Sequence, residues 1–271
     1  MTAPVLSASL CHTLLSQSPR HAWWQSPALN PAYVREESDA FDLGNAEHAY
    51  VLKGETNFVL IDAPDFRTKL AKEMRDTARA EGKTPLLAHR WATVQLMAAE
   101  VWEQLARHDP PGLLQPEGGM AEVSIFFELD GVACRATPDW LSLDHRQIVD
   151  LKTVGASAHP AAFSRALWDK GYAIQAAFYR RAVKAAHGVD AEFRFVAVET
   201  TPPYALSVVA LDPEAQAFAD LQVTEAVRVW KQCLTTGQWP AYPTRTAYAE
   251  VPPWMQTQWL ERQYYGEGAA V

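Results

Sequence analysis

Residues 136–153 read ATPDWLSLDHRQIVDLKT, and the interpretation of the whole chain begins from this stretch. β-branched and aromatic residues of near-alternating polarity predict one strand over residues 132–143 and a second over residues 147–153. A short turn around residues 144–146 separates them. Strands joined by so short a turn lie side by side and antiparallel. The stretch therefore predicts two adjacent strands of one sheet.

Three chemically active side chains lie on these two strands. Asp139 follows Pro138 near the middle of the expected first strand, and Asp150 and Lys152 lie two positions apart on the second. Residues two apart on a strand share a face, so Asp150 and Lys152 project together while Leu151 turns into the core. The hairpin thus brings two carboxylates and one ammonium to a common place.

Such a group suits the hydrolysis of phosphodiesters. Two carboxylates can hold one or two Mg²⁺ ions through oxygen ligands, and the metal polarises the phosphate and activates water. The lysine can orient or deprotonate the attacking water, or stabilise the transition state. The alternative is a surface hairpin with solvated charges, because this spacing alone recurs by chance. The apolar neighbours of Asp150 favour the functional interpretation, since a carboxylate in a buried strand needs a partner or a metal.

The rest of the chain alternates between helical and extended patterns. Apolar residues at helical spacing predict helices over residues 6–16, 43–52, 66–81, 91–108, 160–186 and 212–234. Short apolar and β-branched runs predict strands over residues 57–62, 122–129, 191–199 and 204–211. Asp130-Gly131 is a strong signal for a two-residue hairpin turn. This order predicts an α/β fold with a mixed central sheet of about five strands flanked by helices.

No internal repeat or linker divides the sequence, so a single domain over residues 1–271 is expected. Within it we distinguish an N-terminal helical part over residues 1–115, a catalytic core over residues 116–235 and a C-terminal tail over residues 236–271. The tail is rich in Trp, Pro and Tyr. We expect it to wrap the surface of the domain.

Composition narrows the class of protein. The chain has 271 residues and is 48% hydrophobic, and no apolar run approaches the roughly 20 residues that span a bilayer. The N-terminus lacks the basic start and apolar block of a secretory signal. Cys11, Cys134 and Cys233 are far apart, which fits a reducing cytoplasm and excludes a Cys-rich metal or iron–sulfur site. The net charge of −8 counts weakly against nucleic-acid binding, so a basic DNA-binding surface is expected only locally.

A second polar pair lies on the helix expected after the hairpin. Gln175 and Tyr179 are four residues apart, so they share one helical face. The Gln175 amide could hold a catalytic group or a substrate phosphate, and Tyr179 could do the same one turn later. The alternative is a hydrogen-bonded glutamine beside a tyrosine packed in the core, and these two residues alone favour that alternative.

Together these motifs resemble the PD-(D/E)XK nuclease superfamily, in the branch with RecE (exonuclease VIII), lambda exonuclease and the RecB nuclease domain. That branch has Pro-Asp on one strand, Asp-x-Lys on the next and Gln-x-x-x-Tyr on the following helix. The matching segments here, in the same order, are Pro138-Asp139, Asp150-Leu151-Lys152 and Gln175-Ala176-Ala177-Phe178-Tyr179. The resemblance implies a restriction-endonuclease-like core.

The resemblance to RecE-like phage exonucleases extends over residues 7–253. These proteins carry a Gly-(Thr)-Ala-x-His helix near the N-terminus whose histidine is a metal ligand, and the matching segment is Gly44-Asn45-Ala46-Glu47-His48. Shorter similarities are Arg67-Thr68-Lys69, Gly82-Lys83-Thr84, Glu122-Val123-Ser124-Ile125, Cys134-Arg135-Ala136 and Gly171-Tyr172. One departure is Thr137, where the family leads us to expect an arginine. This departure bears on a DNA or structural contact and leaves the implied metal ligands intact.

The resemblance implies a metal site. Asp139 and Asp150 would be metal ligands, and the carbonyl of Leu151 would complete the shell. His48 would be a further ligand from the N-terminal helix, and Glu122 would be an acidic residue near the metals. The implied cofactor is Mg²⁺, with Mn²⁺ as a substitute, at one or two ions per site.

The resemblance also implies which residues are catalytic. Lys152 would be the catalytic lysine beside the two aspartates, and Gln175 and Tyr179 would line the site. For the histidine ligand, only the family segment favours His48, because a lone helical histidine is more often a surface or core residue. His89, just before a long helix, is the rival candidate, and His21 is expected to pack near the N-terminal tryptophans.

On this resemblance the chain would be a Mg²⁺-dependent deoxyribonuclease, a 5′→3′ exonuclease acting on double-stranded DNA ends in phage-type homologous recombination. Such relatives pass the single-stranded product to an annealing protein of the RecT type and work as rings, so a ring-shaped homo-oligomer is expected. The implied setting is the cytoplasm of a bacterial host, with a phage or prophage origin. Two alternatives stay open: an endonuclease of the same fold, and a catalytically inactive DNA-binding or interaction protein.

Overall fold

The computed structural model describes residues 4–34, 39–54 and 57–266. The chain forms two compact units, Met1–Pro240 and Ala241–Val271. The first unit contains every strand of the described residues and both hydrophobic cores. The second contains helix α9 (Pro253–Gly266). None of the helices in these ranges has the length and apolar character needed to cross a membrane.

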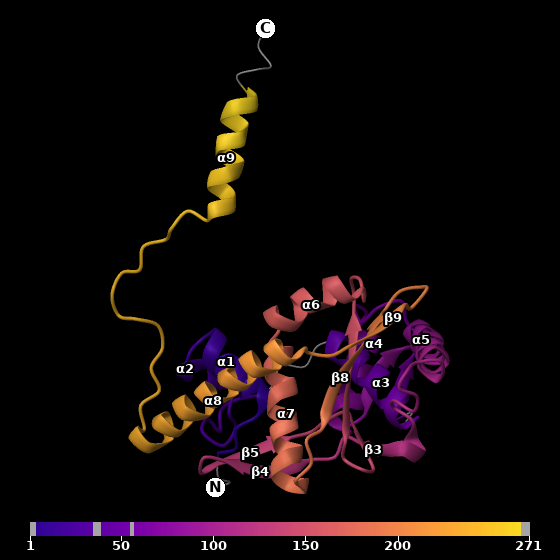
Figure 1. Ribbon diagram of the computed structural model, residues 1–271. Helices are drawn as coiled ribbons and strands as arrows, with labels where there is room; N and C mark the ends of the chain where they lie inside the picture. The colour runs from indigo at the N-terminus through magenta and orange to yellow at the C-terminus, as the bar shows by residue number, and fades with distance from the viewer. Residues whose placement is uncertain (1–3, 35–38, 55–56, 267–271) are drawn as a thin grey trace. The chain divides into compact units, whose positions relative to one another are not determined.

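Helices and strands alternate along the first unit, and its helices are labelled in Figure 1. They are α1 (Ala8–Ser16), α2 (Pro19–Trp24), α3 (Asp39–Lys53), α4 (Lys69–Ala80), α5 (Ala88–Ala106), α6 (Pro160–Asp169), α7 (Tyr172–His187) and α8 (Pro213–Thr236), with a short 3-10 turn η1 (Pro116–Gly118). Local chemistry sets their ends. The Asp212 carboxylate caps α8 by accepting from the N–H of Ala215 at 2.8 Å, and Gly188 ends α7 in the left-handed conformation.

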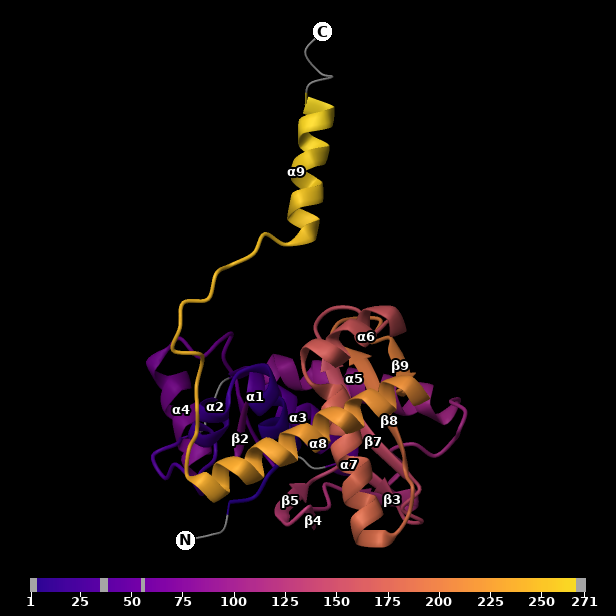
Figure 2. The same ribbon diagram turned by 60° about the vertical axis from the view of Figure 1, so that its left-hand side comes forward.

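The central sheet is mixed and lies between helices. In the described part of the chain it has five strands, in the order β3 (Gly119–Ala121), β6 (Trp140–Ser142), β7 (Gln147–Val154), β8 (Glu192–Glu199) and β9 (Leu206–Val209). β7 and β8 run parallel, and the other neighbouring pairs are antiparallel. In Figures 1 and 2, α7 lies against one side of these strands and α8 crosses over α7. The predicted α/β fold with a five-stranded mixed sheet flanked by helices is confirmed.

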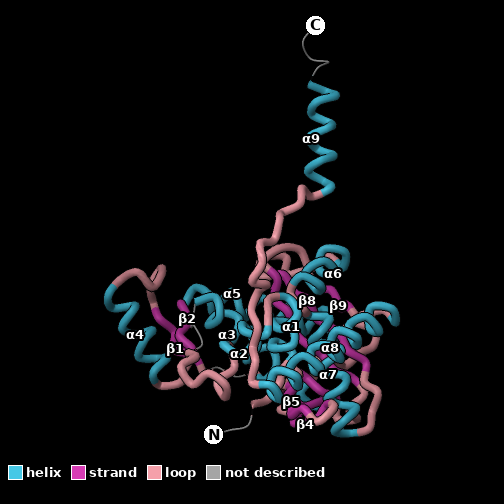
Figure 3. The backbone as a smooth tube through the Cα atoms, turned by 90° about the vertical axis from the view of Figure 1, so that its left-hand side faces the viewer, coloured by secondary structure: helices cyan, strands magenta, loops and turns pink. Residues whose placement is uncertain are grey.

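Two smaller strand pairs flank this sheet. β4 (Ile125–Leu129) and β5 (Val132–Ala136) form an antiparallel hairpin whose turn is Asp130-Gly131, both with positive φ, as predicted. β1 (Phe58–Ile61) and β2 (Thr84–Leu87) pair in parallel, and the intervening α4 packs on both, as the grouping in Figure 3 shows. The sequence analysis predicted β1 but not β2, whose Pro85 has no N–H for a strand ladder and counts against a strand.

The strand predicted over residues 132–143 is wrong as one element. β5 ends at Ala136 and pairs with β4, whereas β6 begins at Trp140 and joins the central sheet. Pro138 breaks the run, because proline has no N–H for a ladder and restricts the residue before it. Asp139 therefore lies in a bend at the start of β6, rather than in the middle of a strand.

The helix predicted over residues 160–186 is likewise two helices. α6 ends at Asp169 and α7 begins at Tyr172. Gly171 lies between them with a φ of +70°, a left-handed conformation that a residue without a Cβ adopts at low cost. The break directs α7 across the sheet and places Gln175 in its first turns.

The sheet is buried on both faces, in two separate cores. Alternate residues of a strand point to opposite faces, so Ile148 and Phe195 belong to the core formed with α1, α6, α7 and α8. Leu151 and Val196 belong to the core on the side of α3 and α5. Asp150 shares the face of Ile148, so its carboxylate points toward α7 from within a buried strand.

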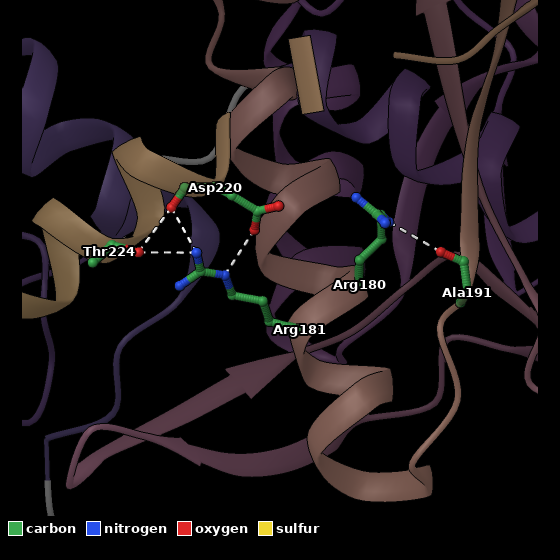
Figure 4. Close-up of polar contacts among 5 residues, drawn as sticks. All are labelled: Arg180, Arg181, Ala191, Asp220 and Thr224. Carbon is green, nitrogen blue, oxygen red and sulfur yellow. Dashed lines mark hydrogen bonds and ion pairs between the residues drawn. The ribbon is translucent and has the colours of Figure 1, made fainter. Parts of the chain in front are cut away.

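Polar contacts fix the position of α7 (Figure 4). Arg181 donates from Nε to Asp220 Oδ1 at 2.8 Å, and its terminal nitrogen donates to the Asp220 carbonyl and to Thr224 on α8. Arg180 donates to the carbonyl of Ala191 at 3.0 Å, just before β8. These bonds tie α7 to α8 and to the central sheet, which holds the helix that carries Gln175.

Candidate active site

Two carboxylates meet where β6 and β7 begin to separate. Trp140 lies opposite Val149 in the antiparallel register, so one further step places Asp139 opposite Asp150. At this point the side chain of Asp139 is hydrogen-bonded to β7: its Oδ2 accepts the N–H of Leu151 at 2.8 Å. Asp150 is fully buried. The predicted convergence of Asp139 and Asp150 is thus built into the strand register.

Each oxygen of Asp150 has a partner of its own. Gln175 Nε2, from α7, donates to Oδ2 at 2.6 Å. The partner of Oδ1 among the described residues is the ammonium of Lys152, held as an ion pair rather than by an aligned hydrogen bond. Asp150 therefore joins the strand to α7, and one of its oxygens depends on a single cation.

The Lys152 ammonium lies between the aspartates and an aromatic ring. Its Nζ is 4.8 Å from the centroid of Tyr172, an arrangement that favours the cation. Burial lowers the pKa of Lys152, but the attraction of Asp150 and Asp139 outweighs burial and raises that pKa above its usual value. Lys152 is therefore a protonated, positively charged group in this arrangement.

The acid pair carries electrostatic strain. Burial raises the pKa of Asp139 well above its usual range, and repulsion by Asp150 raises it further. The opposing attraction of Lys152 is too small to cancel these effects. A bound divalent cation would offset this strain, because it would supply the positive charge that the pair lacks.

His48 approaches the pair from α3. Its Nδ1 lies 3.6 Å from Asp139 Oδ2. Burial lowers the pKa of His48 despite the neighbouring carboxylates, so the neutral imidazole, which is the form that binds metals, is favoured. His89 is exposed in the first turn of α5. The geometry therefore favours His48 over its rival.

Glu122 is near the pair but already engaged. It has a φ of +52°, and its N–H donates to the carbonyl of Asp139 at 3.0 Å. Its carboxylate forms a 2.6 Å ion pair with Lys53 at the end of α3. Glu122 thus helps to hold the bend at Asp139, and its role as a direct ligand stays a prediction.

Gln175 connects the pair to Tyr179. Tyr179 forms a side-chain hydrogen bond with Gln175, and burial, together with repulsion by Asp150, raises the pKa of its phenol. A cavity of about 420 Å³ lies beside these two residues. Its other lining residues are Ser7, Ala8, Ser9, His12, Thr13, Arg135, Thr137, Lys170, Gly171 and Tyr172, a set with two permanent cations and no acid.

Sequence analysis missed three residues that shape the site. Glu47 on α3 is buried and hydrogen-bonded to Thr153, next to Lys152, and burial raises its pKa. Lys53 neutralises Glu122, and the ring of Tyr172 underlies Lys152. Helical spacing could have indicated Tyr172, since it lies three residues before Gln175 and shares its face.

The donor set fits a divalent metal ion, although it is not preassembled. No group of three His, Cys, Asp or Glu side chains within residues 4–34, 39–54 and 57–266 converges closely enough to hold an ion. The available donors are carboxylate oxygens and a neutral imidazole, which suit Mg²⁺ or Mn²⁺. Lys152 must leave Asp150 Oδ1 before that oxygen can bind a metal. The repulsion between the buried Asp150 and the partly buried Asp139 explains why a cation would be accepted there.

Comparison with known proteins agrees with this geometry. Residues 10–251 match the family model described as "PDDEXK-like domain of unknown function (DUF3799)". The chain belongs to this family. The match covers most of the first unit, including His48, Asp139, Asp150, Lys152 and Gln175, and confirms the predicted membership of the PD-(D/E)XK superfamily. No curated protein matches the chain.

A solved structure shares the fold at low sequence identity. The crystal structure of a "Putative exonuclease" from Eubacterium rectale is 14% identical, with a TM-score of 0.55, and the match covers 92% of this chain and 91% of that one. A phage related exonuclease from Haemophilus somnus 129PT is 12% identical, with a TM-score of 0.34, and the match covers 86% of this chain and 96% of that one. At such identity, the first likeness concerns the fold alone.

Proposed function

We propose that this PDDEXK-like protein is a metal-dependent deoxyribonuclease. The observation that carries the proposal is the convergence of the buried Asp150 on β7 with the partly buried Asp139 in the bend before β6, with Lys152 in contact. A structural ion pair would need one carboxylate per cation. Two mutually repelling carboxylates are costly to bury, which favours a role that uses their excess negative charge.

Asp139, Asp150, His48 and the carbonyl of Leu151 would hold Mg²⁺, or Mn²⁺ in its place, with Glu122 nearby. One or two such ions supply positive charge that polarises the scissile phosphate and activates water. Binding would also relieve the repulsion within the acid pair. The same charge would release Lys152 from Asp150.

The chain's own residues would then act on the DNA. Lys152, once released, donates hydrogen bonds to the phosphate oxygens, where negative charge accumulates in the transition state. Gln175 keeps the Asp150 carboxylate oriented through its 2.6 Å hydrogen bond. Tyr179 holds the Gln175 amide from the next helical turn.

The cavity beside Gln175 suits a DNA phosphate. Arg135 and Lys170 line it with several hydroxyl groups and without an acidic side chain. This local positive surface accounts for how a chain of net charge −8 can bind a polyanion. Thr137 lines the same cavity, so the replacement of the expected arginine changes a contact of this surface rather than the metal ligands.

We further propose a 5′→3′ exonuclease that digests double-stranded DNA ends in phage-type recombination. The support is the resemblance to RecE-like proteins over residues 7–253. On the same ground we propose a ring-shaped homo-oligomer and transfer of the single-stranded product to a RecT-type annealing protein. Light scattering tests the ring, and a monomer at every concentration would contradict it.

One cleavage experiment tests the central proposal. Linear duplexes labelled at the 5′ or the 3′ end are incubated with wild type, Lys152→Ala and Lys184→Ala, in Mg²⁺ or in chelator. Lys184 pairs with Asp190 at the surface and serves as the matched lysine control. We expect cleavage only in Mg²⁺, a loss of roughly 100-fold or more in Lys152→Ala, and no change in Lys184→Ala.

Full activity of Lys152→Ala, or full activity in chelator, would remove the mechanism. The two labels report polarity, because release of the 5′ label first supports 5′→3′ digestion. A covalently closed circle separates the exonuclease from an endonuclease of the same fold, since only the endonuclease cuts it. A protein that binds these DNAs but cuts none of them in Mg²⁺ would instead be the inactive binding protein.

A further inference from the structure

A second cavity lies on the other side of the site, at the end of α3. It has a volume of about 480 Å³. Its lining residues are Val51, Lys53, Gly54, Trp102, Leu105, Ala106, Leu113, Leu114, Gln115, Pro116 and Glu117. The walls are mostly apolar, and Lys53, Gln115 and Glu117 add polar groups. Apolar walls with a few polar groups are typical of a pocket for a small organic group.

Trp102 on α5 is the aromatic wall of this cavity. Its Nε1 donates to the carbonyl of Val51 at 3.4 Å, and its ring packs against Tyr50 with centroids 5.6 Å apart. Tyr50 is in turn supported by Trp91, at 4.7 Å. Trp102 nevertheless stays 42% exposed. The indole is thus fixed at one edge and supported by other rings, while much of its surface is free to contact a ligand.

The cavity is connected to the catalytic carboxylates by short contacts. Lys53, which lines it, pairs with Glu122 at 2.6 Å, and the N–H of Glu122 donates to the carbonyl of Asp139. Gln115, which also lines it, accepts at its carbonyl from Trp140 Nε1 at 3.1 Å. Trp140 directly follows Asp139 in the chain. Two residues that line the cavity, Lys53 and Gln115, are thus each linked to the bend at Asp139 through one intermediate residue.

We propose that the cavity takes an unstacked nucleobase of the DNA strand whose phosphate lies at Asp139 and Asp150, stacked on Trp102. This inference rests on the proposed nuclease function. A base is planar and apolar on its faces and polar at its edges, which matches an indole wall with a lysine, a glutamine and a glutamate at hand. Stacking on an aromatic ring tolerates any base, so the cavity would add affinity without selecting sequence.

The test combines a substrate change with a protein change. A series of DNA strands each carries one abasic nucleotide, moved position by position along the substrate. Binding is measured by fluorescence anisotropy with Ca²⁺ in place of Mg²⁺, under conditions where no product forms. The proteins are wild type, Trp102→Ala, Trp102→Phe and Trp168→Ala. Trp168 on α6 is 41% exposed and lines neither cavity, which makes it the matched control.

For wild type we expect about ten-fold weaker binding when the abasic nucleotide occupies one particular position, and little change elsewhere. Trp102→Ala should bind intact DNA about ten-fold more weakly and lose this dependence on position. Trp102→Phe and Trp168→Ala should keep it. Because the abasic series is first run on wild type, the result does not depend on the folding of any variant.

Two outcomes overturn the base pocket while the nuclease stands. One is that wild type cleaves DNA, but its binding is unaffected by an abasic nucleotide at any position. The other is a Trp102→Ala protein that keeps the position dependence of wild type. A wild type that neither binds nor cuts DNA in the preceding cleavage assay overturns the nuclease itself, and the base pocket with it.

Discussion

At the scale of single residues, the candidate site holds two carboxylates whose closeness costs stability. Asp139 and Asp150 share one end of a buried strand pair, with Lys152 as the nearby cation. Burial and mutual repulsion raise the pKa of Asp139, so its ionised form weakens the metal-free protein. Residues selected for folding alone would not be arranged in this way, because a neutral pair would be more stable.

Asp139→Asn should therefore stabilise the metal-free protein while abolishing cleavage. The asparagine oxygen can still accept the N–H of Leu151, and the repulsion with Asp150 disappears. We expect a gain of about 1–2 kcal/mol in the free energy of unfolding in chelator, measured by urea denaturation. We expect Mg²⁺ to raise the melting temperature of wild type, and this variant should lose that rise. Unchanged or lower stability in chelator would contradict the account of strain.

Gln175→Leu should damage both stability and activity. It removes the donor to Asp150 Oδ2 and leaves a buried carboxylate oxygen without that partner. We expect a loss of about 1–3 kcal/mol in the free energy of unfolding. Metal affinity, followed by calorimetry, should fall by roughly 10-fold or more, because an oriented ligand becomes mobile.

Gln216→Leu is the matched control for this change. Gln216 also donates one short hydrogen bond through Nε2, to the carbonyl of Leu211 at 2.7 Å, but at the start of α8. The Gln216→Leu protein should be less stable than wild type but keep its metal affinity. A Gln175→Leu protein with the metal affinity of wild type would show that Gln175 does not position Asp150.

At the scale of elements, the junction between α6 and α7 sets where Gln175 lies. Gly171 has a φ of +70°, and a Cβ there would collide with the ring of His12 on α1. Its neighbour Tyr172 supports Lys152. The glycine thus allows α1 to approach the start of the helix that completes the site.

Gly171→Ala should lower the free energy of unfolding by about 2 kcal/mol or more, because it combines a strained backbone with a steric overlap. Gly188→Ala is the control, since Gly188 has a φ of +72° and open space around its Cα. That variant should lower the free energy of unfolding by only about 1 kcal/mol, because the left-handed conformation is its only cost. Urea denaturation of the two variants checks the difference, and equal losses would mean that the contact with His12 is relaxed easily.

At the scale of the whole molecule, the two cores and the sheet between them lie within the unit Met1–Pro240. In the second unit, every residue from 241 to 264 is exposed, including Trp254 and Trp259. The prediction that the tail belongs to a single domain and wraps its surface stays a prediction. Stability of the first unit should not depend on the tail.

A chain ending at residue 240 should have a free energy of unfolding within about 1 kcal/mol of that of the full chain. The dependence of this free energy on urea should also be similar. The physical reason is that the removed residues contribute nothing to the described cores. Circular dichroism during urea denaturation measures this. A loss of several kcal/mol would show that the tail packs on the domain, as the sequence-based prediction holds.

The sequence by itself determined the fold class, the hairpin at Asp130-Gly131 and the pairing of Asp139 with Asp150 and Lys152. These follow from local rules, because strand alternation and turn chemistry act over a few residues. The family segments also indicated His48, whose position beside Asp139 the structure then supplied.

Only the tertiary structure decided which distant groups meet. The break at Pro138 follows from a local rule that the predicted strand over residues 132–143 did not take into account, whereas the parallel pair of β1 and β2 depends on contacts that no local pattern records. The contacts of Lys53 with Glu122 and of Tyr172 with Lys152 join separate elements. Such contacts depend on how helices pack on the two faces of the sheet, and packing is a property of the whole chain rather than of any stretch of it.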